Sequence, residues 1–218
     1  MVQSAATRAV RPSDDDAEGV RGRILDAAQD VFAARGYAGA TTREIAERAG
    51  IGKRMLFYYF PTKDAVYRGV LERVVQGLVA IHATFRDEPG AIGLGDAVGG
   101  LTHFVAGNLP AFKVWMREII DGGPHLAELT RTYIAPLYAT AGEEVRRNMA
   151  DGVFAPGDPL QVLVSVGGVS LFYFLILPML PHIVDGDPLA PAALEARAAA
   201  ARAFVMHGLA GAAGSGGE

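Results

Sequence analysis

The amino-acid sequence predicts an all-α protein on three grounds. Apolar residues recur at the helical spacings of three and four along most of the 218 residues. Alternation of apolar and polar residues, which indicates strands, is not sustained over a useful length. The pattern breaks at Gly and Pro, which end helices. We therefore expect about nine helices, in an N-terminal three-helix domain over residues 20–65 and a larger helical domain over 66–210, between a disordered tail at 1–19 and a flexible tail at 211–218.

Composition excludes several kinds of site. The chain is 50% hydrophobic and 20% charged and contains no cysteine. Disulfides, thiolate metal ligands and cysteine nucleophiles are therefore excluded, and a cytoplasmic location suits the chain. The N-terminal residues lack the apolar region of a secretory signal, so we expect none.

One charge-free stretch, residues 159–184, is long enough to cross a bilayer. Polar residues and prolines interrupt it, however, and no block of Lys/Arg flanks either side. We therefore expect a buried or partner-binding helix there instead of a membrane span.

The first expected helix carries one apolar stripe within "VRGRILDAAQDVFAARGY". Its members are Ile24, Leu25, Ala28, Val31 and Phe32. Gly36 is placed to end this helix, since glycine accepts the left-handed conformation that follows a helix.

The next two helices are short and follow each other closely. Thr41 and Glu44 have capping-box spacing, which predicts a helix that begins after Thr41 and ends at a left-handed Gly50. A third helix over residues 53–60 is ended by Pro61, which cannot continue a hydrogen-bonded turn. Two short helices joined by a glycine-containing turn form a helix-turn-helix, whose second helix fits the major groove of DNA.

Packing between these two helices is expected to depend on small residues. Ala46 and Gly50 lie four apart on one face, and their size is expected to let the helices approach closely. The apolar contacts are expected from Ile45, Ala49, Ile51 and Leu56.

A long fourth helix is expected after Thr62, which can cap it. Its apolar positions are Val66, Val70, Val74, Leu78, Ile81 and Phe85. Further helices are expected at about residues 95–107, 111–121, 125–150, 159–180 and 190–208. Pro136 is expected to kink the helix over 125–150.

Charge is distributed unevenly between the two expected domains. Residues 20–65 hold eight Lys/Arg and five Asp/Glu, a net charge of +3, whereas residues 66–218 hold ten and fifteen, a net charge of -5. A basic N-terminal domain suits the neutralisation of DNA phosphates. A solvated basic face on an ordinary helix pair is the alternative, and charge alone does not separate the two.

The spacing of residues within "GATTREIAERAGIGKRMLFYYFPTKDAV" favours DNA binding, because this stretch resembles the signature of the TetR family of bacterial regulators. The resemblance is strong over residues 21–70, whereas the C-terminal part is similar in layout only. The matching positions are Gly36, Thr41, Thr42, Ile45, Ala46, Ala49, Gly50, Leu56, Tyr59, Phe60, Lys63 and Val66.

The resemblance implies a ligand-responsive DNA-binding transcriptional regulator, most often a repressor, that binds a palindromic operator as a homodimer. The positions implied to lie near base edges are Thr42, Arg43, Lys53, Arg54 and Met55. Those implied to hold phosphates are Thr41, Tyr58, Tyr59 and Lys63. Phe57 stands where the family usually has Tyr, so it either touches a thymine methyl group or packs inward. The cations favour guanine-containing half-sites.

Two half-sites about one helical turn apart require a two-fold dimer. The expected dimer helices are "PLQVLVSVGGVSLFYFLILPML" and "PAALEARAAAARAFVMHGLA", which resemble the last two helices of the family. Ser165, Gly167 and Gly168 would permit close contact between copies. The alternative is that both helices belong only to the core of one chain.

The middle helices, roughly residues 95–150, combine large apolar side chains with few polar ones, as small-molecule pockets do. The preferred ligand contacts are His103, Trp115, Tyr133 and Phe172. They predict a small, mostly apolar effector. No cofactor is expected, and the five histidines lack the spacing of metal ligands.

An enzyme is the main alternative class. The sequence has no nucleophile elbow, phosphate loop or dinucleotide fingerprint, and none of its five serines lies in a nucleophile motif. We therefore expect no catalytic activity. A third alternative is a ligand-independent architectural or activating DNA-binding protein, which an effector would neither stabilise nor displace from DNA.

Overall fold

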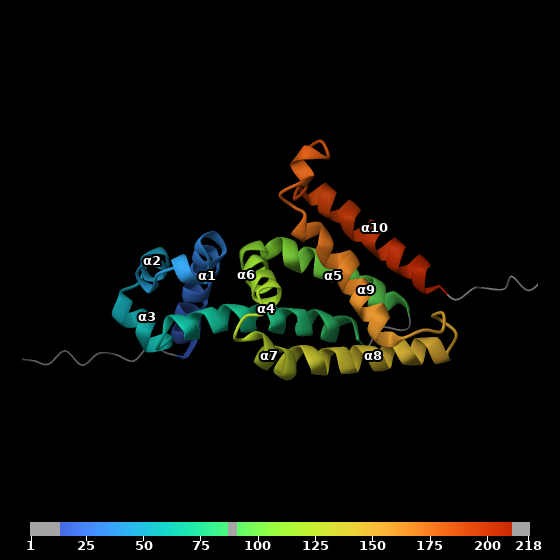
Figure 1. Cartoon of the computed structure of the whole chain (residues 1–218), viewed down its shortest axis with the longest axis horizontal. Coiled ribbons are helices and arrows are strands. Elements are labelled where there is room, and N and C mark those ends of the chain that lie inside the picture. Colours follow the sequence, from blue (N-terminus) through green and yellow to red (C-terminus); the bar gives the residue numbers. More distant parts are fainter. Residues whose placement is uncertain (1–13, 87–90, 211–218) are drawn as a thin grey trace, which may run out of the picture. The chain divides into compact units, whose positions relative to one another are not determined.

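The computed structural model describes residues 14–86 and 91–210, which fold into helices (Figure 1). Within these ranges there is no strand, and the isolated β-bridge pairs Phe154 with Ala210. The all-α prediction is confirmed. The tail expected at 211–218, and the first thirteen residues of the N-terminal one, lie outside the described residues.

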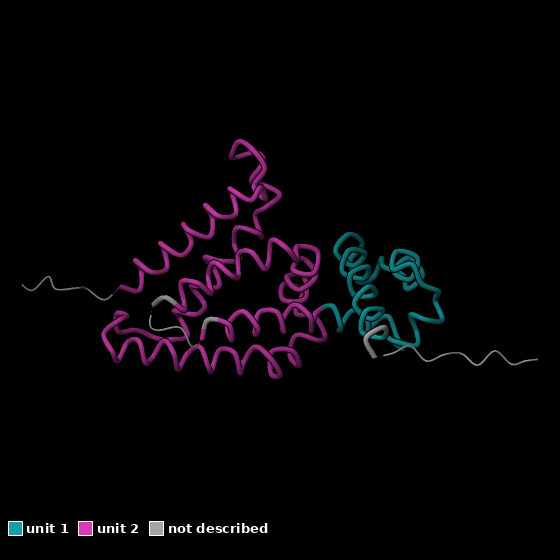
Figure 2. Tube along the Cα trace, turned by 180° about the vertical axis from the view of Figure 1, so that it is seen from behind, with its two compact units in different colours: residues 1–70 teal, residues 71–218 magenta. Residues whose placement is uncertain are grey.

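The chain divides into two compact units, residues 1–70 and residues 71–218 (Figure 2). The division falls inside helix α4 (Lys63–Phe85), which runs on from the first unit into the second. The boundary expected after residue 65 therefore lies slightly too early.

Helix α1 (Asp14–Gly39) begins within the stretch expected to be a disordered tail. Residues 14–19 are helical, which corrects that expectation for this part of the chain. The sequence explains the earlier start, because aspartate at positions 14–16 is a residue type that favours the first turn of a helix. All five members of the predicted apolar stripe of α1 are buried.

Gly36 and Gly50 supply the two left-handed positions that the sequence predicts. Gly36 has φ 68° and interrupts the helical backbone inside α1. Gly50 has φ 67°, but a Cβ at this position would meet no atom within 4 Å. The expectation that its small size permits close helix packing is therefore wrong, and it is the backbone conformation that favours glycine here.

Helices α2 (Thr42–Arg48) and α3 (Lys53–Tyr59) form the predicted pair. The Thr41 hydroxyl accepts a hydrogen bond from the Glu44 N–H at 3.1 Å, which caps α2. Thr62 caps α4 in the same way through the Ala65 N–H at 3.0 Å. Ile45 of α2 and Leu56 of α3 are fully buried, so apolar burial holds the pair together.

The second unit contains the remaining helices. They are α5 (Ala91–Gly107), α6 (Leu109–Ile120), α7 (Leu126–Leu129), the π-turn η1 (Thr130–Ile134), α8 (Ala135–Ala150), α9 (Pro159–Leu175), the short η2 (Leu180–His182) and α10 (Pro191–Leu209). Val98 of α5 packs against Ala201 and Val205 of α10. Val105 of α5 packs against Phe112 of α6 and Phe174 of α9.

Prolines set two irregular points in this unit. Pro136 stands in the first turn of α8, and the π-turn η1 directly precedes this helix. The irregularity expected at Pro136 therefore takes the form of a wider helical turn just before the proline. Helix α9 ends at Leu175, whereas the sequence predicts residue 180. The helix stops early because Pro178 disfavours helical backbone in the residue before it. Among the described residues, no helix combines the length and apolarity that a bilayer crossing needs.

Candidate functional site

Helix α3 separates its side chains into a buried face and an exposed face. Leu56 is fully buried inside the first unit. Lys53, Arg54, Met55, Phe57 and Tyr58 are all exposed. Tyr58 is 70% exposed, and Phe57 is 37% exposed, so Phe57 does not pack inward. Such a mixture of exposed cations and large apolar groups on one short helix is typical of a surface that binds a partner.

Two cations at the start of α3 are free to make new contacts. Within the described part of the chain, Arg54 has no ion-pair partner. The Lys53 ammonium lies 5.6 Å from the centre of the Phe57 ring, a cation–π contact that leaves its hydrogen-bond donors available. The sequence identified both residues correctly as exposed cations on the second helix of the pair.

Other cations of the first unit are already paired. Arg43 Nε donates to Glu47 Oε1 at 2.8 Å on the exposed face of α2. This hydrogen bond, followed by the charge of Glu47, raises the pKa of Arg43. Arg48 Nη2 lies 2.6 Å from Asp30 Oδ2. A count of charges therefore overstates the number of cations that are free to bind phosphates.

Lys63 also makes contacts inside its own unit. Its ammonium lies 4.5 Å from the centre of the Tyr37 ring and 3.4 Å from the carbonyl oxygen of Ala38. Burial, followed by the charge of Asp64, raises the pKa of Tyr37. Lys63 is thus less free than the resemblance implies, although an ammonium has three donors and the carbonyl uses one.

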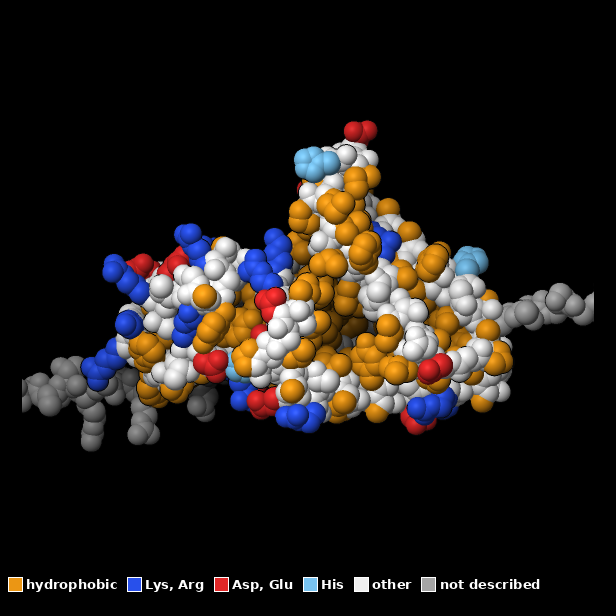
Figure 3. Space-filling view, in the orientation of Figure 1, with side chains coloured by type: hydrophobic (Ala, Val, Ile, Leu, Met, Phe, Trp, Pro, Cys, Tyr) orange, Lys and Arg blue, Asp and Glu red, His pale blue; other side chains and the backbone are white. Residues whose placement is uncertain are grey.

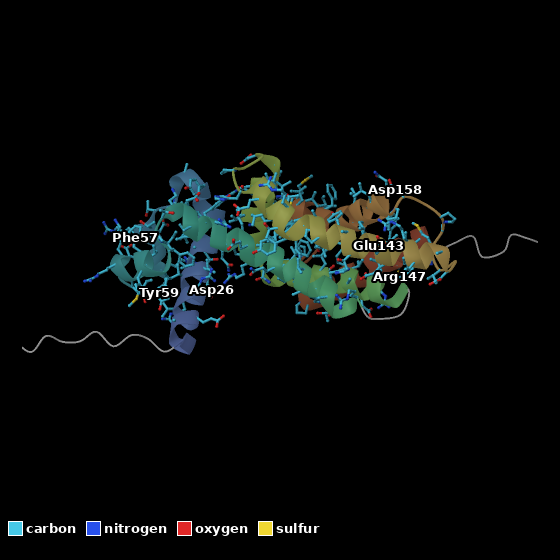
Figure 4. The ribbon with its side chains drawn as sticks, turned by 90° about the horizontal axis from the view of Figure 1, so that it is seen from below. Asp26, Phe57, Tyr59, Glu143, Arg147 and Asp158 are labelled. Atoms are coloured by element: carbon cyan, nitrogen blue, oxygen red, sulfur yellow. The ribbon has the colours of Figure 1, made fainter. Side chains whose placement is uncertain are left out.

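Tyr59 differs from the expectation of a phosphate contact. Its hydroxyl is buried and has no hydrogen-bond partner among the described residues. Its ring packs edge-to-face on Tyr58, with the ring centres 5.2 Å apart. The ring of Tyr59 is therefore partly covered, whereas Tyr58 is exposed. Figure 4 labels Phe57 and Tyr59 on this helix.

Helices α4, α5, α6, α8 and α9 enclose a cavity of about 480 Å³ in the second unit. Its wall is mostly apolar, and Trp115 of α6 lines it as predicted. Trp115 is only 5% exposed. A cavity of this size and lining falls in the range of small-molecule sites.

The other three predicted ligand contacts do not line the cavity. His103 hydrogen-bonds Glu195 Oε1 at 3.0 Å, which links α5 to α10. The Tyr133 hydroxyl oxygen accepts a hydrogen bond from Gln76 Nε2 at 3.4 Å. Phe172 is 58% exposed on the outer face of α9. Residue type suggested a ligand contact for each of them, whereas the helical face on which each residue lies directs it away from the wall of this cavity.

The sequence interpretation missed the polar end of the cavity. His82 Nε2 of α4 lies 3.1 Å from Glu144 Oε2 of α8, and both residues line the wall. The α8 residues that line it include Leu137, Tyr138, Ala141, Val145 and Asn148. Their spacing of three and four marks one helical face, so this periodic signal could have found them. The pairing of His82 with Glu144 has no such signal, since the two are distant in sequence.

Among the described residues, no group of three or more His, Asp or Glu side chains is arranged to hold a metal ion.

Comparison with known proteins agrees with this arrangement. Residues 24–70 match the model of the family described as bacterial regulatory proteins, tetR family. The chain is 27% identical over 161 residues to the HTH-type transcriptional regulator RutR of Escherichia coli, which covers 73% of this chain and 76% of RutR. It is 47% identical over 60 residues to the transcriptional activator FasR of Mycolicibacterium smegmatis, covering 28% of this chain and 27% of FasR.

The fold is also similar to solved structures. The TetR family regulator PfmR of Thermus thermophilus superposes with a TM-score of 0.71 at 20% identity, over 86% of this chain and 98% of PfmR. The proteins named here are all described as transcriptional regulators or activators.

Proposed function

Because the chain belongs to the TetR family of bacterial transcriptional regulators, we propose that it is a homodimeric repressor that binds a palindromic operator and releases it when a small, mostly apolar effector binds. The observation that carries the DNA-binding part is the exposed face of α3. There Lys53 and Arg54, which have no ion-pair partner among the described residues, lie beside Met55, Phe57 and Tyr58.

The side chains of this face suit the groups of a major groove. Lys53 and Arg54 can donate to the O6 and N7 atoms of guanine. Met55 and Phe57 offer apolar surface to thymine methyl groups. The Tyr58 hydroxyl can reach a phosphate oxygen.

Helix α2 contributes the second set of contacts. The Thr41 hydroxyl accepts the cap hydrogen bond from Glu44 and keeps its own proton to donate to a phosphate. Thr42 begins the helix beside it. Arg43 must exchange Glu47 for a DNA group, and Lys63 can add a phosphate contact while it keeps its place over Tyr37. Tyr59 supports the ring of Tyr58 instead of binding phosphate.

The cavity supports the effector-responsive part of the proposal. An apolar wall with Trp115 and Tyr138 suits a ligand with an aromatic or aliphatic body. The polar residues of the wall, which include His82, Glu144, Arg147 and Asp151, suit a polar group on that ligand. A ligand releases DNA only to the extent that it binds the DNA-free conformation more tightly. A ligand-independent DNA-binding protein would have no use for such a cavity.

Salt dependence tests the proposed DNA contacts. Purified full-length chain is titrated onto an operator duplex in a gel-retardation assay between about 50 and 200 mM salt. We expect affinity to fall steeply as salt rises, because phosphate contacts release bound cations. An affinity that stays flat over this range would contradict binding through phosphates.

A further inference from the structure

The cavity of the second unit is bordered by a carboxylate whose hydrogen bonding is incomplete. Glu144 Oε2 of α8 lies 3.1 Å from His82 Nε2 of α4, and the ring nitrogen donates because an ionised carboxylate only accepts hydrogen bonds. Glu144 Oε1 is buried and has no hydrogen-bond partner among the described residues. Native proteins pair nearly all buried polar atoms, so an oxygen of this kind indicates a partner from outside the chain.

The neighbours of Glu144 along α8 are engaged elsewhere. Asn148, one turn further on, donates to the backbone carbonyl oxygen of Glu144 at 2.9 Å and not to the carboxylate. Arg146 forms an ion pair with the exposed Glu143. His82 satisfies only one of the two carboxylate oxygens. The Glu144 carboxylate therefore keeps the capacity to accept a hydrogen bond from a ligand.

Glu144 is also the most enclosed charged residue of the described cavity wall. Its side chain is 20% exposed, whereas the other Asp, Lys or Arg side chains of that wall, Arg86, Arg147 and Asp151, are exposed. Water weakens the interactions of exposed charges, and a charge enclosed among apolar groups interacts more strongly. A ligand inside the cavity therefore meets a negative charge at Glu144.

The surroundings of this carboxylate are apolar. Leu78 and Ile81 line the wall beside His82 on α4, and Ala141 and Val145 line it beside Glu144 on α8. Figure 3 shows a hollow of the second unit from outside, lined by hydrophobic side chains between α6, α8 and α9. A molecule that fills this space needs a mostly apolar body and one polar group placed to reach Glu144.

We propose that the effector is an apolar amine, whose ammonium group donates to Glu144 while its apolar body fills the cavity. The inference rests on the proposed function, because it names the ligand class of the same cavity. An ammonium group brings both hydrogen-bond donors and a positive charge to the carboxylate. A hydroxyl group brings a donor without the charge, and an ionised carboxylate brings neither. Affinity should therefore fall in the order amine, alcohol, acid.

Three probes that share one apolar body separate these polar groups. Decylamine, decanol and decanoic acid are titrated calorimetrically into the purified full-length chain at neutral pH and without DNA. The fluorescence of Trp115, the sole tryptophan, reports whether each probe enters the cavity that it lines. We expect decylamine to bind at least about tenfold more tightly than decanoic acid, with decanol between them, because hydrogen bonds between charged groups are among the strongest.

Glu144→Gln keeps the size of the side chain and removes its charge. This variant should lose most of the preference for decylamine. Glu143→Gln is the matched control, since it makes the same change one residue away on a side chain that does not line the cavity, and it should keep the wild-type preference. Arg147→Gln tests whether an arginine of the wall reads the polar group, and it should also keep that preference. Circular dichroism verifies the helix content of each variant.

Two results would overturn the inference and leave the proposed function standing. One is binding of decanoic acid as tight as that of decylamine. The other is a Glu144→Gln variant with the wild-type preference for the amine. If none of the three probes binds, the inference falls together with the effector-responsive part of the proposed function, whereas operator binding is judged separately by its salt dependence.

Discussion

Lys53 and Arg54 occupy the first two positions of α3, and within the described residues neither has an ion-pair partner. We predict that Lys53→Ala and Arg54→Ala each weaken operator binding, since a bidentate contact to guanine is worth roughly 1 to 3 kcal/mol. Gel retardation measures the loss, and circular dichroism should show an unchanged fold. If both variants keep the sequence selectivity of the wild type, neither residue reads bases.

Glu47 Oε1 accepts a hydrogen bond from Arg43 Nε at 2.8 Å, so Glu47 competes with DNA for the guanidinium of Arg43. We predict that Glu47→Gln strengthens operator binding, because it removes a negative charge beside the DNA-binding face and frees the guanidinium. The gain should shrink as salt rises. Glu143→Gln, which removes one charge from the second unit, is the control and should leave affinity unchanged. Weaker binding by Glu47→Gln would show that Glu47 positions Arg43 for DNA.

Tyr58 and Tyr59 are neighbours with opposite surroundings. Tyr58 is exposed, whereas the hydroxyl of Tyr59 is buried without a partner among the described residues. We predict that Tyr58→Phe weakens operator binding and that Tyr59→Phe does not. Removing an unpaired buried hydroxyl should also preserve or raise stability, since leaving such a group unsatisfied costs about 1–3 kcal/mol. Loss of DNA binding in Tyr59→Phe, with stability intact, would restore Tyr59 as a phosphate contact.

At the scale of whole elements, the first unit was predictable because its signals are local. The cap at Thr41, the left-handed Gly36 and Gly50, and the stop at Pro61 each act within a few residues of where they stand. The sequence therefore indicated α2 and α3 almost to the residue. It did not indicate which side of α3 Tyr59 would face, because that depends on how the helix packs.

Gly50 lies in the turn between α2 and α3. A side chain at this position would meet no atom within 4 Å, so substitution costs free energy only through the backbone conformation. We predict that Gly50→Ala destabilises the protein by about 1–2 kcal/mol, the penalty for a left-handed residue with a side chain. Gly52→Ala is a matched control in the same turn, because Gly52 has φ -75° and equally open surroundings. Thermal unfolding compares the two, and equal stability of the variants would contradict the argument from φ.

At the scale of the whole molecule, the helical character of each unit could be predicted from the sequence more reliably than the residues that line the cavity. Trp115 lies in the cavity wall as the sequence predicts, whereas His103, Tyr133 and Phe172 do not line the cavity. The cavity is enclosed by five helices, and which residues meet there depends on tertiary packing that local patterns do not encode. Only the face of α8 that includes Tyr138 and Ala141 carries a periodic signal for it.

We propose that the exposed face of α3, doubled by two-fold symmetry, binds DNA in two successive major grooves. Selection of bound duplexes from a random library by the purified full-length chain tests it most directly. We predict enrichment of an inverted repeat whose half-site centres lie about 34–36 Å apart along the helix axis. Enrichment of no sequence, or of a single site without a repeat, would contradict the account.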